Sequence, residues 1–169
     1  VLSAAQSHPC IVWYENDGNE NFTDHAISNS EYGWGAYSVH TADVDGDGDI
    51  DVLSGTGGVL PGGGDEISWY ENDGSENFSE HYLSTTAGSE ASDVFAVDMD
   101  NDGDIDVLCA IDFNFAWYEN NGSESFTEHI FSGIFMTHPG AVYPVDADAD
   151  GDMDVLLASE GNDVIALFK

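Results

Sequence analysis

The chain has 169 residues, of which 41% are hydrophobic, a length and composition typical of one globular unit with its own core. Its 34 acidic residues face a single basic one, Lys169, and the formal net charge is −33. A surface of this sign repels nucleic acid and anionic membranes, which excludes both as expected partners and favours divalent cations. No apolar run reaches the roughly 18 residues of a membrane-spanning helix, so membrane insertion is not expected either.

One phrase of sequence recurs along the chain and sets its period. It reads I-V-W-Y-E-N-D-G-N-E-N-F-T-D-H in its first copy, and the three copies span Ile11–His25, Ile67–His81 and Phe115–His129. Their tryptophans stand 56 and 48 residues apart, and a glycine-rich insertion at 57–64 accounts for the longer interval. A period of about 50 residues indicates a propeller or another repeat array.

We expect four short strands within each period. The first covers Ala36–Ala42, and the second starts at Asp51 after an acidic loop. The third is the I-x-W-Y-E segment, whose alternation places Trp and Tyr on opposite faces, and the fourth is the N-F-x-x-H segment. D-G or N-G pairs between these two strands predict tight two-residue hairpin turns, at Asp17-Gly18, Asp73-Gly74 and Asn121-Gly122. No stretch shows a helical period, so almost no helix is expected.

The acidic loop reads D-x-D-x-D-G-x-x-D and occurs three times, at Asp43–Asp51, Asp98–Asp106 and Asp146–Asp154. Carboxylates at positions 1, 3 and 5 can converge on one hard cation, position 7 can add a backbone carbonyl, and Asp at position 9 can close the shell. Gly at position 6 permits the sharp turn that bends the loop round the ion. Ca²⁺ prefers such a shell, whereas Mg²⁺ demands tighter octahedral geometry. The alternative is a solvated acidic turn, which three copies in register disfavour.

The acidic loop differs from an EF-hand, although the two begin alike. An EF-hand places a bidentate Glu at position 12 and continues into a helix. Position 12 here is Ser54, Cys109 or Leu157, and the surrounding residues are typical of a strand. The loop therefore joins two strands.

The acidic loop, the W-Y-E-N-D-G phrase and the F-x-x-H segment together resemble the FG-GAP/VCBS family of calcium-binding β-propeller repeats, to which the blades of integrin α-subunits are related. The resemblance covers nearly the whole chain and implies four-stranded blades round an axis, with one Ca²⁺ in each loop between the first and second strands. The implied ligands are side chains of Asp43, Asp45, Asp47 and Asp51 with the carbonyl of Asp49; Asp98, Asp100, Asp102 and Asp106 with the carbonyl of Asp104; and Asp146, Asp148, Asp150 and Asp154 with the carbonyl of Asp152.

The expected fold is all-β, a β-propeller-type array of four-stranded antiparallel blades with about three and a half repeats, as part of a larger ring or assembly. We divide the chain into a partial blade without its first strand, two blades that carry the first and second loops, and a partial blade that carries the third loop, at 1–35, 36–90, 91–140 and 141–169. Family propellers close with more blades, so the expected neighbours of residues 1–10 and 160–169 are further blades of a longer chain or other copies of this one.

No catalytic constellation is visible, because the histidines at 25, 81 and 129 recur at one structural position and no arginine offers an anion clamp. An enzyme is not expected. Two functions stay open: a calcium-stabilised structural or adhesive building block, or a module that recognises a glycan or protein. Unfinished sheets favour the first, and exposed aromatic residues such as Tyr32, Trp34 or Tyr37 would favour the second.

The setting is expected to be extracellular or at the cell surface, because cytosolic calcium is too scarce for most weak carboxylate sites. Three N-x-S/T sequons, at Asn21, Asn77 and Asn121, are candidate glycosylation sites. The two cysteines, Cys10 and Cys109, fall at different places in different repeats, which predicts separate thiols and no disulfide framework.

Overall fold

The structure is a computed structural model, and it describes residues 1–5, 11–28, 35–57, 67–84, 91–111, 114–131 and 137–169. These residues form 14 β-strands and no helix. The strands make four antiparallel sheets, which confirms the all-β array of blades predicted from the repeats. None of the described residues forms a helix with the length and apolar character needed to cross a membrane.

Each sheet is a chain-order meander of neighbouring antiparallel strands. Sheet 1 contains β1 (Leu2–Ala4), β2 (Ile11–Asn16) and β3 (Phe22–Ala26). Sheet 2 contains β4 (Ala36–Ala42), β5 (Asp51–Thr56), β6 (Ile67–Asn72) and β7 (Phe78–Ser84). Sheet 3 contains β8 (Ala91–Val97), β9 (Asp106–Ile111), β10 (Asn114–Asn120) and β11 (Phe126–Phe131). Sheet 4 contains β12 (Pro139–Val145), β13 (Asp154–Ser159) and β14 (Val164–Phe168).

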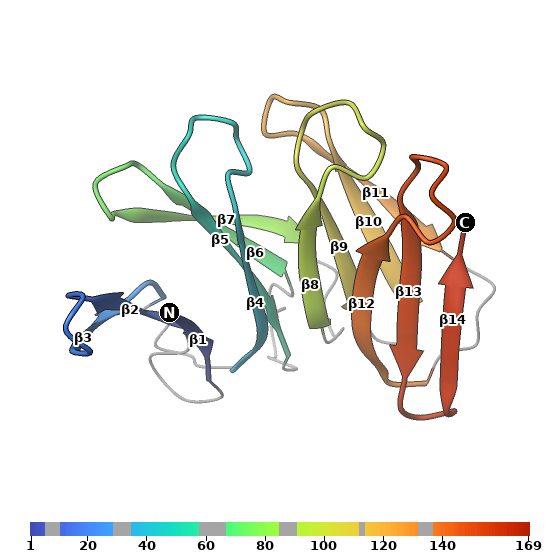
Figure 1. The fold of residues 1–169 in the computed structure, drawn as a ribbon, viewed down its shortest axis with the longest axis horizontal. Helices are drawn as coiled ribbons and strands as arrows, with labels where there is room; N and C mark the ends of the chain where they lie inside the picture. The colour runs from blue at the N-terminus through green and yellow to red at the C-terminus, as the bar shows by residue number, and fades with distance from the viewer. Residues whose placement is uncertain (6–10, 29–34, 58–66, 85–90, 112–113, 132–136) are drawn as a thin grey trace.

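The first strands of sheets 2, 3 and 4 lie beside one another, with β8 in contact with both β4 and β12 (Figure 1). Sheet 1 has no strand in the corresponding place among the described residues, and β1 is its edge strand. The other strands of each sheet extend away from this inner row, as the strands of propeller blades do.

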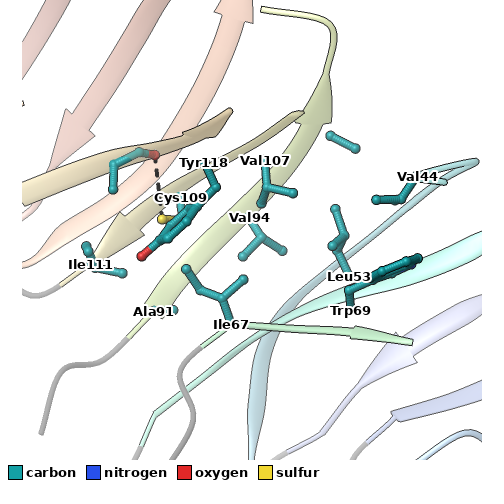
Figure 2. Close-up of a cluster of buried hydrophobic side chains, with 12 residues drawn as sticks. Val44, Leu53, Ile67, Trp69, Ala91, Val94, Val107, Cys109, Ile111 and Tyr118 are labelled. Carbon is teal, nitrogen blue, oxygen red and sulfur yellow. Dashed lines mark hydrogen bonds between the residues drawn. The ribbon is translucent and has the colours of Figure 1, made fainter. Parts of the chain in front are cut away.

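The side chains between sheets 2 and 3 form the largest apolar cluster, which includes Leu53 and Trp69 from sheet 2 and Val94 and Val107 from sheet 3 (Figure 2). The indole of Trp69 is 2% exposed and meets the ring of Phe126 edge-on, with ring centroids 6.4 Å apart. Its neighbour Tyr70 belongs instead to the cluster on the side of sheet 1. The alternation of Trp and Tyr between opposite faces is therefore confirmed.

The repeated histidines have a structural role on the outer strands. In each of three sheets the imidazole stacks on the tryptophan directly across the strand pair, with ring centroids 4.3 to 4.6 Å apart. The Nε2 atom of each histidine also lies 2.7 to 3.2 Å from a glutamate oxygen. The stacked pairs are Trp13–His25, Trp69–His81 and Trp117–His129, and the glutamates are Glu15, Glu71 and Glu119.

The predicted two-residue hairpins are wrong. The register pairs Asn16 with Phe22, which leaves a five-residue connection at 17–21, and the other two phrases have the same spacing. The carboxylate of Asp17 explains the wider turn, because its Oδ1 accepts hydrogen bonds from the backbone N–H groups of Asn19 (2.7 Å) and Asn21 (3.3 Å). A side chain that bonds its own backbone in this way competes with the tight turn that a D-G pair otherwise favours.

The described cysteine, Cys109, is buried, and its thiol donates to the carbonyl of Ala116 with the sulfur 3.6 Å from the oxygen. Cys10 lies outside the described residues, as do Tyr32 and Trp34. Tyr37 is described and is 45% exposed.

Candidate metal centres

Three acidic loops lie along one edge of the molecule, at the top of Figure 1, and each joins the first strand of a sheet to the second. Loop 1 (Asp43–Asp51) joins β4 to β5, loop 2 (Asp98–Asp106) joins β8 to β9, and loop 3 (Asp146–Asp154) joins β12 to β13. The inner row of strands thus sets the spacing of the loops.

Two backbone positions in each loop adopt the left-handed conformation that lets the loop curl. Position 6 is glycine in every loop, with φ between 98° and 100° at Gly48, Gly103 and Gly151. Position 4 is left-handed as well, although only loop 1 has glycine there: Gly46 has φ 78°, Asn101 has 62° and Ala149 has 61°. The sequence motif marks position 6 but leaves position 4 unspecified.

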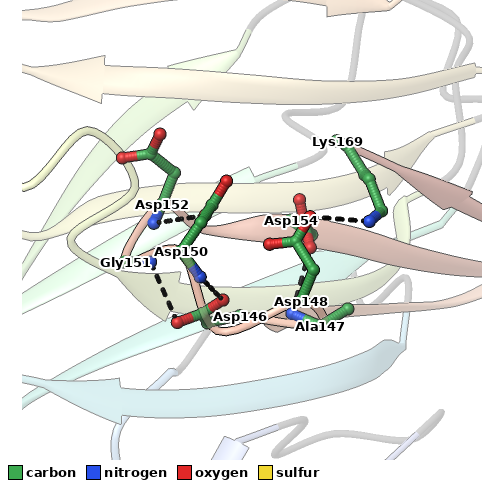
Figure 3. Close-up of polar contacts among 8 residues, drawn as sticks. All are labelled: Asp146, Ala147, Asp148, Asp150, Gly151, Asp152, Asp154 and Lys169. Carbon is green, nitrogen blue, oxygen red and sulfur yellow. Dashed lines mark hydrogen bonds and ion pairs between the residues drawn. The ribbon is translucent and has the colours of Figure 1, made fainter.

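Backbone N–H groups inside each loop hold the first carboxylates in place. In loop 3 the Oδ2 of Asp146 accepts from the N–H of Gly151 at 3.2 Å, and its Oδ1 accepts from the N–H of Asp150 at 3.2 Å (Figure 3). Loops 1 and 2 repeat the bond from position 6 to position 1, at 3.0 and 3.1 Å. These bonds keep the acidic side chains turned into the loop despite their mutual repulsion.

Each loop brings three carboxylates together with oxygen atoms within 4.8 Å of one another. In loops 2 and 3 the members come from positions 1, 3 and 9, whereas in loop 1 they come from positions 1, 3 and 5. The three groups are Asp43, Asp45 and Asp47; Asp98, Asp100 and Asp106; and Asp146, Asp148 and Asp154. Asp51, Asp102 and Asp150 lie in the loops but outside these close groups.

The side chains at position 7 turn toward the neighbouring hairpin in loops 1 and 2. The carboxylate of Asp49 packs against Gly74, and that of Asp104 packs against Gly122, where a Cβ atom would collide with it. With the side chain directed there, the backbone carbonyl is the group that position 7 can offer to the loop. That carbonyl contribution, at Asp49, Asp104 and Asp152, stays a prediction.

Position 9 is a buried carboxylate in every loop, because Asp51 and Asp106 are 0% exposed and Asp154 is 5% exposed. The Oδ2 atoms of these aspartates accept from the backbone N–H of position 2 at 3.0 Å. In Asp51 and Asp106 the Oδ1 atoms also accept, at 2.8 Å, from the backbone N–H at the end of the third strand. Burial raises the pKa of Asp51 and of Asp106, and these backbone N–H groups oppose the rise.

The donor atoms of loop 1 fit a divalent cation. The Oδ1 of Asp43 is buried and has no hydrogen-bond partner among the described residues. A buried carboxylate oxygen without a partner is costly unless a positive charge approaches it. An oxygen-only donor set on a flexible loop is the kind that binds Ca²⁺, with the aspartates as ligands.

Loop 3 differs from the others because a basic side chain reaches it. The Nζ of Lys169 lies 2.7 Å from the Oδ2 of Asp148 (Figure 3). The hydrogen bond from Lys169 lowers the pKa of Asp148, and the pKa of Lys169 rises in return. No other lysine or arginine exists in the sequence, so loops 1 and 2 have no basic side chain of this kind.

Sequence reasoning missed one residue that orders these loops, the asparagine that ends the W-Y-E-N phrase. Asn120 is 2% exposed, and its Nδ2 donates to the carbonyl of Ile105 in its own loop at 3.1 Å and to the carbonyl of Val44 in loop 1 at 3.0 Å. It therefore ties loop 1 of sheet 2 to sheet 3. Its recurrence at one position of the phrase was the available signal.

Comparison with known proteins bears on both the repeats and the fold. The family model described as FG-GAP-like repeat matches residues 1–54, 59–109 and 98–157. Comparison with curated proteins gave no match.

A solved structure of an Agrocybe aegerita lectin, described as specifically recognising non-reducing terminal N-acetylglucosamine, is similar with a TM-score of 0.58 at 16% identity. The alignment covers 94% of this chain and 46% of the lectin chain, so the chain spans less than half of the lectin's length. At this identity the likeness concerns the fold.

Proposed function

Because the chain belongs to the FG-GAP-like repeat family, we propose that it is a calcium-stabilised structural and adhesive module that works outside the cell. One observation carries the proposal: each loop gathers three carboxylates whose oxygen atoms lie within 4.8 Å of one another and also contains a buried aspartate at position 9, in a chain with a single basic side chain. A cation from solution is the remaining source of compensating charge. Oxygen donors alone favour Ca²⁺.

Calcium in these loops would stabilise contacts between strands and between sheets together. Asp106 at position 9 of loop 2 bonds the start of that loop, through Met99, and the end of β10, through Asn120. A Ca²⁺ ion that neutralises the loop carboxylates strengthens this three-way junction. Binding to the folded state alone stabilises it, by about 2.7 kcal/mol per site at a ligand concentration of 100 times Kd.

Thermal unfolding with and without calcium tests the proposal. We expect a chelator to lower the Tm sharply and Ca²⁺ to restore it better than Mg²⁺. Asp100→Ala removes one member of the loop 2 group and is expected to remove one bound ion in a calcium titration. Asp24→Ala, on the exposed face of β3, is the matched control and leaves the calcium count unchanged. An identical melting curve in excess chelator contradicts the proposal.

Glycan recognition is the second candidate function. A groove of about 490 Å³ lies between sheets 2 and 3, and its lining combines aromatic rings with carboxylates, at Trp69, Glu80, His81, Tyr82, Leu83, Glu124, Ser125 and Phe126. Aromatic faces beside carboxylate acceptors are suited to a sugar ring with its hydroxyl groups. The similarity to a lectin that recognises N-acetylglucosamine supports this candidate.

Titration with N-acetylglucosamine at saturating Ca²⁺ tests glycan recognition. Tyr82 is 52% exposed at the groove, so Tyr82→Ala is expected to weaken binding. Tyr143→Ala removes a similarly exposed tyrosine from β12, away from the groove, and serves as the control. If the unaltered chain shows no saturable binding of N-acetylglucosamine, glycan recognition is contradicted and the structural and adhesive role remains.

A further inference from the structure

An open groove between sheets 1 and 2 is lined by residues at the same repeat positions as those round a second site, between sheets 2 and 3. In the second site the side chain of Val44 fills the space. The filled site holds Val44, the residue at position 2 of loop 1, which is 3% exposed. Val44 shares a cluster with Leu53 and Trp69 of its own sheet and with Val107 of sheet 3 (Figure 2), and Ile105 and Phe126 pack against that cluster. Loop 1 is thus anchored by one apolar side chain placed between two sheets.

The open groove has a volume of about 430 Å³. The strand registers make Leu2 and Trp13 of sheet 1 the counterparts of Leu53 and Trp69, since each pair faces across its strands in the same way. The lining of the groove contains a counterpart of each of the five residues named above round Val44, namely Leu2, Trp13, Ile50, Val52 and Phe78. It has no counterpart of Val44 itself.

The hydrogen bonds of the equivalent asparagines Asn120 and Asn72 also differ between the filled site and the open groove. Asn120 donates through Nδ2 to two carbonyls, those of Ile105 and Val44. Asn72, at the equivalent position and in the lining of the open groove, donates to the carbonyl of Ile50 at 3.2 Å, the counterpart of the first bond. No described residue supplies a carbonyl in the place of Val44. The exposure of the equivalent isoleucines also fits an unfilled groove: Ile50 beside it is 55% exposed, whereas Ile105 beside the filled site is partly buried.

The edge of β1 offers the backbone pairing that such an occupant needs. In sheet 2 the residues before loop 1 form β4, which pairs with β5. The strand equivalent to β5 in sheet 1 is β1, and it pairs with β2 alone among the described strands. An edge strand with unpaired N–H and C=O groups is a template for one more strand.

We propose that this groove binds the strand-and-acidic-loop segment of another FG-GAP-like repeat. The strand pairs with β1, the apolar residue at position 2 of the loop fills the space between Trp13 and Phe78, and the carbonyl of that residue accepts from Asn72. The partner is defined by the contact that Val44 and Asn120 already make. The inference goes beyond the proposed function, since the contact is apolar and amide-based and its readouts do not require calcium.

A fusion tests the proposal with the full chain. The sequence of residues 36–51 is placed directly before Val1, because Val1 aligns with Val52 and the repeat phrase then continues without a break. We expect a higher Tm, a shift of the Asn72 side-chain amide and of the Trp13 indole in NMR spectra, and protection of the added strand from hydrogen exchange. In calcium we also expect one more bound ion than the unfused chain has.

Two variants of the fusion serve as controls. Asp in place of the added copy of Val44 keeps every acidic side chain but is expected to abolish docking, because a charge would enter an apolar site. Asn72→Ala in the fusion removes the donor and is expected to lower the gain in Tm without abolishing strand pairing.

Three outcomes overturn the proposal. The first is an added segment that exchanges freely while the Asn72 and Trp13 signals stay unchanged. The second is a gain in Tm that survives the Val-to-Asp replacement in the added loop. The third is a dimer of the unfused chain whose formation shifts those two signals, since the occupant would then be a second whole copy.

Discussion

The ammonium group of Lys169, directly after β14, lies 2.7 Å from the carboxylate of Asp148, and the two central sheets carry glutamate at the equivalent repeat position. Phe168 pairs with Val155 as Tyr118 pairs with Val107, so Lys169 is the counterpart of Glu119, and likewise of Glu71. The same repeat position is therefore negative beside loops 1 and 2, at Glu71 and Glu119, and positive beside loop 3, at Lys169. The third candidate metal centre differs in its electrostatics from the first two.

We predict that Lys169→Glu strengthens calcium binding at loop 3. A positive charge next to the carboxylates competes with the ion, so its replacement by a negative charge is expected to lower the Kd of loop 3 for Ca²⁺. Calcium titration calorimetry at low salt measures the effect, and added salt should shrink it. Glu119→Lys is the reciprocal variant and should weaken loop 2. Equal affinity of loop 3 before and after Lys169→Glu contradicts the prediction.

Replacement of Ala149 by glycine is expected to stabilise the fold. Ala149 occupies position 4 of loop 3 with φ 61°, a conformation that costs a side chain about 1 kcal/mol relative to glycine. Part of the gain is offset because glycine also makes the unfolded chain more flexible. Urea unfolding measures the change, and Gly46→Ala at the same position of loop 1 should destabilise the fold by a similar amount. A loss of stability in Ala149→Gly would rule out strain at this position.

His40 is expected to make stability depend on pH. Its Nδ1 accepts from the backbone N–H of Ala96 at 3.3 Å, which joins β4 to β8. Burial lowers the pKa of His40 below 6.5, and the nearby carboxylate of Asp93 opposes this. Because the folded pKa is the lower one, the contribution is complete above the unfolded pKa of about 6.5 and is lost as pH falls from there through the folded pKa.

The measurement is the urea midpoint between pH 7.5 and pH 5.5 in saturating Ca²⁺. His40→Asn retains a side-chain acceptor without the titrating ring, so its midpoint should fall less over this interval than that of the unaltered chain. The other histidines are present in both proteins, and their effects cancel in the comparison. Equal slopes in the two proteins would show that His40 does not contribute.

The three sequons remain candidate glycosylation sites, and their asparagines are exposed on the hairpin connections. Asn21 and Asn77 donate through Nδ2 to the carboxylates of Asp17 and Asp73 at 2.8 and 2.9 Å, whereas Asn121 accepts through Oδ1 from the N–H of Ser123. We predict that secretion from a eukaryotic host adds sugar at all three. Intact mass before and after Asn-to-Gln replacement counts the sites, and a bare polypeptide mass refutes the prediction.

The strands could be predicted from the sequence because local patterns determine them. The repeated phrase and the loop spacing predicted a first strand at Ala36–Ala42, where β4 lies, and a second strand from Asp51, where β5 begins. The alternation of Trp and Tyr also indicated correctly that the two side chains lie on opposite faces of the strand. Side-chain periodicity and glycine positions are properties of short segments, so a single sequence reveals them.

The contacts between sheets could not be predicted in the same way. The bond from Asn120 to Val44 joins residues 76 positions apart and depends on how two finished sheets pack. The hairpins failed for a different reason, since the carboxylate of Asp17 bonds two backbone N–H groups and overrides the D-G preference. The grouping of positions 1, 3 and 9 in loop 2 likewise requires Asp106 to be buried at the base of the loop, which only the packed structure reveals.

Because β9 is completely buried, sheet 3 is expected to be the part of the molecule that resists unfolding under force the longest. Every residue of this strand is buried, and its sheet lies between sheets 2 and 4, whereas β1 and β14 contain only partly buried and exposed residues. In an array where sheets contact only their neighbours, loss of structure begins where a neighbour is lacking and moves inward. A molecule pulled from both termini would therefore fray at its outer sheets first. Sheets 2 and 3 would stay folded together, with loops 1 and 2 intact. When the force is released, the outer sheets can refold onto this folded pair.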